Sequence, residues 1–308
     1  MSDASPTDTT DSPSLDATAG GRLPEFLIIG AAKCGTTSLF NLMADHPEVY
    51  APFKKELWFF NEGIDGPGDL KAYRNYFAGA APDQAAGEAT PGYLYYADAT
   101  ISGLRRAYDA PPKFLIILRD PVRRFWSHYL HNRAHGWELR SFEEVLRDGP
   151  EHFSSSSIHH FFAVGRFGEQ IQEWFSAFPR SRFQVTFLED LAGDPESVLL
   201  DIFRFLDVRP TVDPIRLDRQ HNSAWTPRSE FVRDVVDPFV WRAARKLLPE
   251  AWSWRIHKTV KRLNKRPIEQ KPEMSVEGRA RLADYYRDDV ARLQRLLDRP
   301  LPDAWPAA

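Results

Sequence analysis

The stretch Phe26-Leu-Ile-Ile-Gly-Ala-Ala-Lys33-Cys-Gly-Thr-Thr-Ser-Leu39 carries the strongest structural signal in the sequence. Four large apolar residues end at Gly30, a short loop with a second glycine follows, and apolar residues then recur at helical spacing. This order predicts a buried strand, a glycine-rich loop and a helix. The helix should stop near His46-Pro47, because the residue before a proline disfavours the helical conformation.

The loop has the glycine spacing of a nucleotide-binding P-loop, but its lysine is displaced. Thr36 follows Gly35 where the Walker lysine is expected, and Lys33 lies inside the loop instead. Backbone N–H groups and the positive end of the helix dipole still form a cradle for an anion. Hydroxyl groups of three successive residues add donors, namely Thr36, Thr37 and Ser38. The loop therefore predicts an anion site, and the alternative is a plain turn between strand and helix.

Two further strands are predicted, at Phe114–Leu118 and at about Phe183–Phe187. The first is a continuous apolar run, typical of a parallel sheet covered on both faces. It ends at Arg119, and the apolar spacing that follows predicts a helix with Ser127 about two turns in. Arg119 and Ser127 can thus share one rim of the sheet.

Further helices are expected around the third strand and at the end of the chain. They cover residues 169–178, 195–206 and 275–297. Alternating strands and helices imply right-handed crossovers, with ligands bound beyond the carboxyl ends of the strands. The prediction is an α/β protein with a three-layer, P-loop-like fold, in which helices flank a central parallel sheet.

Length and composition fit one domain. The chain has 308 residues and a net charge of −3, with 40 Lys+Arg against 43 Asp+Glu, so its charge does not favour a nucleic acid partner. Residues 1–21 hold almost no large apolar side chain and are expected to be a disordered tail before one domain at 22–308. Cys34 is the only cysteine, which excludes an intrachain disulfide. Without a signal or spanning segment, we expect a cytoplasmic protein.

Three motifs in order resemble one enzyme family. They are the stretch from Phe26 to Leu39, Lys55-Glu56-Leu-Trp-Phe-Phe60 and Leu118-Arg119-Asp-Pro-Val-Arg-Arg-Phe-Trp-Ser127-His-Tyr129. The resemblance is to sulfotransferases that use 3′-phosphoadenosine 5′-phosphosulfate (PAPS), above all the heparan sulfate N- and 3-O-sulfotransferases and their bacterial relatives. It covers roughly residues 25–305. It implies in-line transfer of a sulfuryl group from PAPS to a hydroxyl or amine of a glycan, lipid or small-molecule acceptor.

The resemblance also implies roles for individual residues. Lys33 would contact the 5′-phosphate and the oxygen that bridges to sulfur, and Glu56 would act as general base on the acceptor. Arg119 and Ser127 would bind the 3′-phosphate of the adenosine. The segment that holds the phosphosulfate comprises Lys33, Cys34, Gly35, Thr36, Thr37 and Ser38. By its position, Cys34 is a packing residue rather than a nucleophile.

The sequence departs from the heparan enzymes at two places. The Lys-Gly-Arg loop that closes over PAPS is missing upstream of Pro272, although Lys265, Arg266 and Lys271 are near. Ala89 stands where the 3-O-sulfotransferases have a lysine, which weakens the case for a heparan-type acceptor. The neighbouring Glu88 is a second candidate carboxylate.

Several alternatives remain open at this point. His128, His131 and His135 share a helical face with Glu138 beyond, a spacing that could bind zinc, yet no metal is expected in this family. The basic, tryptophan-bearing stretch 241–266 is either a solvated helix or a platform for peripheral membrane contact. The rival functions are a P-loop kinase or NTPase and a non-catalytic nucleotide-binding regulator. Acceptor identity, O- versus N-sulfonation and oligomeric state are undetermined.

Overall fold

The core of the protein is a parallel sheet of five strands with the order β2-β3-β1-β4-β5. The computed structural model describes residues 21–61, 70–151, 159–213, 215–217, 225–227, 259, 263, 265–267 and 272–306. The strands are β1 (Phe26–Gly30), β2 (Val49–Tyr50), β3 (Ala85–Ala89), β4 (Lys113–Leu118) and β5 (Phe183–Phe187). The three strands predicted from the sequence are confirmed. β2 and β3 were not predicted.

Strand β1 occupies the centre of the sheet, between β3 and β4. The chain reaches β3 on one side of β1 and then crosses to β4 on the other. A crevice for a ligand forms at such a reversal of strand order, beyond the carboxyl ends of the strands. The loop after β1 therefore lies at the position that this topology favours for binding.

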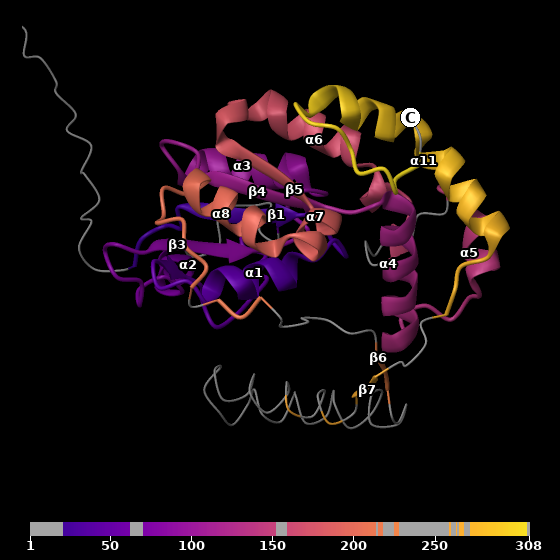
Figure 1. Ribbon diagram of the computed structural model, residues 1–308, viewed down its shortest axis with the longest axis horizontal. Coiled ribbons are helices and arrows are strands. Elements are labelled where there is room, and N and C mark those ends of the chain that lie inside the picture. Colours follow the sequence, from indigo (N-terminus) through magenta and orange to yellow (C-terminus); the bar gives the residue numbers. More distant parts are fainter. Residues whose placement is uncertain are drawn as a thin grey trace, which may run out of the picture.

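Helices cover both faces of the sheet, so the predicted three layers are confirmed (Figure 1). The helices on one face are α1 (Thr36–Ala44), α7 (Leu188–Gly193) and α8 (Pro195–Phe205), and their apolar side chains pack against alternate residues of β1 and β4. The opposite face is covered by α2 (Leu70–Asn75), α3 (Ala97–Ala107), α6 (Phe167–Ala177) and α11 (Val276–Leu296).

A third apolar cluster lies beyond the ends of the strands. It joins α4 (Pro121–His135), α5 (Phe142–Asp148) and the middle of α11. Figure 1 shows α4 standing beside the sheet rather than over one of its faces. The remaining described elements are η2 (Ala163–Gly165), η3 (Arg180–Arg182) and the antiparallel pair β6 (Trp225–Pro227) and β7 (Lys265–Pro267). As predicted, Ser127 lies two turns into α4.

Several sequence predictions fall outside the described residues. These are the tail up to residue 20, Lys271 and most of the basic stretch 241–266. Among the described helices, none is both long and apolar enough to cross a membrane.

Candidate active site

The loop after β1 is shaped by backbone conformations that few residues adopt. Gly35, which precedes α1, has a φ of 96°, and Lys33 has a φ of 70°. Glycine is favoured there chiefly for its dihedral angle, because the nearest obstacle to a Cβ atom is the movable side-chain end of Leu188, with Cδ1 at 2.7 Å. The N–H of Ala31 donates to the carbonyl of Ile117 on β4 at 2.8 Å. This bond fixes the start of the loop to the neighbouring strand.

Two cations meet at the carboxyl ends of β1 and β4. Lys33 and Arg119 are both half-buried, and neither makes a hydrogen bond or ion pair with a described residue. Burial, opposed by Glu56 and aided by the positive charges of Arg119 and Arg124, lowers the pKa of Lys33 to about 8. Burial also lowers the pKa of Arg119. The positive charge gathered here is thus not neutralised by a direct ion pair with a described carboxylate, although Glu56 lies near Lys33, and this arrangement suits an anionic ligand.

Arg124 is a third cation that the sequence analysis did not single out. Its side chain is fully buried, donates to the carbonyl of Phe161 and lies 3.2 Å from Nδ1 of His128, while its Nε has no partner. Among the described residues no carboxylate pairs with it. The sequence did contain one indication that Arg124 is buried, because Arg124 and His128 are four residues apart on the helical face that carries the apolar residues.

Arg119 forms no ion pair with the adjacent Asp120. Asp120 caps α4 instead, because its Oδ1 accepts from the N–H of Val122 at 2.8 Å and from that of Arg123 at 3.4 Å. Ser127, two turns further along α4, is half-buried and makes no hydrogen bond with a described residue. Both predicted ligands of the 3′-phosphate are therefore available, one at a strand end and one on its following helix.

Glu56 lies in a loop close enough to Lys33 for their charges to interact. Its Oε1 accepts from Nζ of Lys55 at 2.6 Å, and 42% of its side chain is exposed. Its backbone is in the left-handed region, with a φ of 65°. An exposed carboxylate beside a phosphate-type cradle can reach a proton on an incoming acceptor.

Glu88, the second candidate carboxylate, is buried. None of its surface is exposed, and its oxygens accept four hydrogen bonds: from the hydroxyls of Tyr73 (2.8 Å), Tyr93 (2.9 Å) and Thr90 (2.7 Å), and from the N–H of Leu57 (3.4 Å). Burial raises its pKa, although these hydrogen bonds oppose the rise. Glu88 therefore has no access to an acceptor in this structure, and Glu56 is the better candidate for the base.

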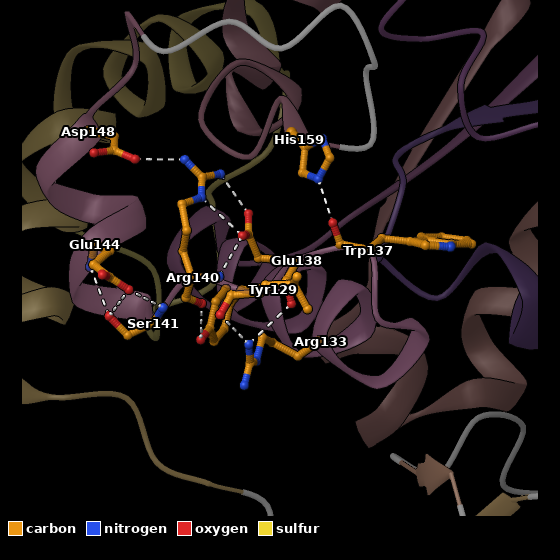
Figure 2. A network of polar contacts seen from close by, with 10 residues as sticks. Tyr129, Arg133, Trp137, Glu138, Arg140, Ser141, Glu144, Asp148 and His159 are labelled. Atoms are coloured by element: carbon orange, nitrogen blue, oxygen red, sulfur yellow. Dashed lines mark hydrogen bonds and ion pairs between the residues drawn. The ribbon is translucent and has the colours of Figure 1, made fainter. Parts of the chain in front are cut away.

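The histidines and Glu138 that shared a metal-type spacing are engaged in other contacts. Glu138 accepts from Arg140 at 2.6 Å, and Arg140 also reaches Asp148 at 2.7 Å (Figure 2). Burial opposes ionisation of Glu138, but hydrogen bonds from Arg140 outweigh it and lower its pKa. Within the described residues no group of three potential metal ligands comes together.

Cys34 behaves as the packing residue that its position suggested. It is fully buried, and burial raises the pKa of its thiol to about 12. A thiol that stays protonated at neutral pH is a poor nucleophile. Its contribution to binding an anion would come from the backbone.

A glycine loop follows the central strand, and Lys33 and Arg119, which form no ion pair with a described residue, lie at the strand ends near Glu56. These features are those of a P-loop-like α/β protein that binds a phosphate-bearing ligand. The position of the Walker lysine is held by Thr36, which does not fit the kinases and NTPases of that class. The family model "Sulfotransferase domain" matches residues 23–291, and the chain belongs to this family.

Relatives of the chain carry related names. It is 25% identical to human Carbohydrate sulfotransferase 15 over 76% of its length and 55% of that protein. It is 29% identical to mouse Bifunctional heparan sulfate N-deacetylase/N-sulfotransferase 1, over 90% of its length and 30% of that protein. A sulfotransferase from Alicyclobacillus acidocaldarius has a similar structure, with a TM-score of 0.64 and 29% identity over 91% of this chain and 98% of that one. The chain thus spans about half the length, or less, of these curated relatives.

Proposed function

We propose that the protein transfers a sulfuryl group from PAPS to a hydroxyl or amine of an acceptor. The observation that carries this proposal is the pair Lys33 and Arg119, two half-buried cations without a carboxylate partner among the described residues. They lie at the ends of adjacent strands, an arrangement that suits a donor whose ribose carries a phosphate at both the 3′ and the 5′ position. Membership of the sulfotransferase family supports the same reading.

Each of these residues would then have its own role in binding or in the transfer. Lys33 neutralises the charge that grows on the bridging oxygen as the bond to sulfur breaks. Arg119 and Ser127 hold the 3′-phosphate by charge-assisted and hydroxyl hydrogen bonds. Glu56 removes the proton from the acceptor as its oxygen or nitrogen attacks sulfur in line. Lys55 donates a hydrogen bond to Oε1 of Glu56 at 2.6 Å and so helps to orient that carboxylate.

A glycan is the acceptor class that we favour. The names of the relatives refer to carbohydrate and to heparan sulfate. Rings suited to stacking on a sugar lie at the C-terminal end of α4, where those of His135 and Trp137 are stacked at 4.5 Å. Trp137 is 46% exposed. The peripheral membrane contact through 241–266 and the cytoplasmic location stay predictions, as does the expectation that no metal is needed.

The decisive experiment is a turnover assay with labelled PAPS and a panel of glycan, phenol and lipid acceptors. Glu56→Gln keeps the size of the side chain but cannot take up a proton. We expect turnover to fall by about 10²–10⁴-fold, with the affinity for the desulfonated product PAP near that of wild type. Glu48→Gln, at a glutamate that pairs with Arg209 outside the candidate site, is the matched control and should remain active.

One result would contradict the proposal as a whole, and another would contradict only the role of Glu56. Wild-type protein that binds PAP but labels no acceptor would indicate the non-catalytic regulator. Normal turnover by Glu56→Gln would leave the sulfotransferase function in place and assign the base to another residue.

A further inference from the structure

The loop that carries Glu56 is held by three hydrogen bonds to one short segment of the sheet. The N–H of Glu56 donates to the carbonyl of Ala89 at 3.1 Å. The N–H of Leu57 donates to Oε2 of Glu88, and that of Trp58 donates to Oγ1 of Thr90, both at 3.4 Å. Three successive amides thus bind three successive residues at the end of β3. We call Glu88, Ala89 and Thr90 the loop clamp.

Glu88 is the central member of the loop clamp because both of its oxygens are fully used. Oε1 accepts from the hydroxyls of Tyr73 and Tyr93, and Oε2 accepts from the hydroxyl of Thr90 and the N–H of Leu57. With four donors around it, the Glu88 carboxylate has no lone pair left that could take up a proton without breaking a hydrogen bond. A buried carboxylate that supported only the core would be costly, since an apolar residue could fill the space without desolvating a charge.

The backbone that the clamp holds is in a conformation that its residues do not favour by themselves. Glu56 has a φ of 65° and Trp58 has a φ of 57°, both left-handed and neither a glycine. Such conformations persist only where surrounding contacts impose them, and they occur most often at functional sites. Released from the clamp, this segment should relax to ordinary dihedral angles, and the side chain of Glu56 would then point elsewhere.

We propose that Glu88 is a positioning residue that, through Leu57 and Thr90, holds the left-handed backbone of Glu56 and so keeps the Glu56 carboxylate within range of Lys33. This inference rests on the proposed role of Glu56 as the base. Glu88 itself does not touch the acceptor or PAPS. It acts on the reaction only by fixing where the base is.

The test replaces Glu88 by glutamine, which turns one of its acceptor atoms into a donor among four donors. We expect kcat to fall about 10–100-fold, because a displacement on the order of 1 Å of a reacting group has an effect of this size. The KM for PAPS and the Kd for PAP should change by less than about twofold, since the clamp does not touch the P-loop. Amide hydrogen exchange in the peptide spanning residues 53–60 should become faster.

Glu25→Gln, at the residue that precedes β1, is the matched control because it also contacts β3. Oε2 of Glu25 also accepts a backbone N–H of β3, from Ala86 at 2.7 Å, but at the end of the strand away from the site. This variant should leave kcat and the exchange of residues 53–60 unchanged. A fall in kcat equal to that of Glu88→Gln would show that any weakening of β3 has the same effect, and it would overturn the proposal.

A second pair of variants covers the case in which Glu88→Gln does not fold. Thr90→Val removes the hydroxyl that links Trp58 to Glu88, whereas Thr90→Ser keeps it. Thr90→Val should lower kcat and speed exchange at 53–60, and Thr90→Ser should restore both. Wild-type kcat and slow exchange in Thr90→Val would overturn the proposal.

The two readouts separate this inference from the proposed function. If Glu56→Gln is inactive while Glu88→Gln retains kcat, the base is correctly assigned and the positioning role is wrong. If Glu56→Gln is active while Glu88→Gln still speeds exchange at 53–60, the clamp holds the loop but the loop does not carry the base.

Discussion

At the scale of single residues, the site is dominated by two cations, Lys33 and Arg119, that form no ion pair with a described residue. Lys33 keeps its proton at neutral pH although burial lowers its pKa to about 8. A lysine in this state is sensitive to anything that changes the local charge. An anion bound beside it stabilises the protonated form, so binding and protonation are linked.

This linkage predicts that the affinity for PAP depends on pH. Protonated Lys33 attracts the nucleotide, so affinity should be highest below pH 8 and should fall as pH rises further, by at most about tenfold per pH unit for one proton. Calorimetric titration of PAP between pH 7 and 9.5 measures the effect. Lys33→Arg should bind with little pH dependence in this range, because arginine stays charged. A flat wild-type profile would mean that Lys33 does not contact the ligand.

The proposed role of Arg119 predicts that the protein distinguishes PAP from adenosine 5′-phosphate. Arg119→Ala should weaken PAP by about 1.5–3 kcal/mol, the range for a hydrogen bond to a charged group, and should change adenosine 5′-phosphate much less. The difference arises because only PAP carries a 3′-phosphate. Equal losses for both ligands in competition titrations would instead assign Arg119 to the fold.

Local order along the chain singled out Lys33, Arg119 and Ser127, and the family resemblance singled out Glu56; the roles of these four residues stay predictions. The burial of Glu88 and Arg124 was not predicted from the sequence. The roles of Glu88 and Arg124 depend on partners that are distant in sequence. Glu88 is enclosed by Tyr73 and Leu57, and Arg124 donates to Phe161. No local pattern reports such contacts.

At the scale of elements, β3 illustrates why two strands were missed. Its sequence, Ala-Ala-Gly-Glu-Ala, has no β-branched or large apolar residue, so propensity argues against a strand. Packing explains the small side chains: a Cβ atom on Gly87 would lie 2.2 Å from the ring of Phe26 on β1. Close packing against Phe26 favours small residues in β3. Small residues lack the β-branched and large apolar side chains by which a strand is predicted from sequence.

Asp120, the N-cap of α4, leads to a prediction about the stability of the fold. Asp120→Ala removes the side-chain acceptor for the N–H groups of Val122 and Arg123 and should lower the free energy of unfolding by about 0.5–2 kcal/mol. Asp120→Asn keeps a side-chain oxygen acceptor and should lower the free energy of unfolding by less. Denaturant unfolding measures both variants. If the two were equally destabilised, the charge of Asp120 rather than its capping bonds would be what α4 requires.

At the scale of the whole molecule, the three-layer architecture was predicted correctly because alternating strands and helices constrain it strongly. The central position of β1 follows from pairings that the sequence does not display. β1 is flanked by β3, which propensity hides, and by β4, which lies far along the chain.

The native fold should be stabilised by PAP without magnesium, since a ligand that binds only the folded state raises its stability by mass action. At a concentration about 100 times its Kd, the increase is about 2.7 kcal/mol. Thermal unfolding with PAP, and separately with ATP and magnesium, measures it. A large shift with ATP–magnesium and none with PAP would favour the kinase or NTPase alternative.

The central place of β1 also affects how the chain is made. Of the described strands, β1 is synthesised first, yet Phe26 pairs with Gly87 on one side and with Lys113 on the other. During translation both edges of β1 therefore stay open until β3 emerges, and one edge stays open until the ribosome has released β4. An open apolar strand is a template for association with other chains. The nascent protein should depend on chaperones during this interval, and slower translation upstream of Leu118 should lower the yield of soluble protein.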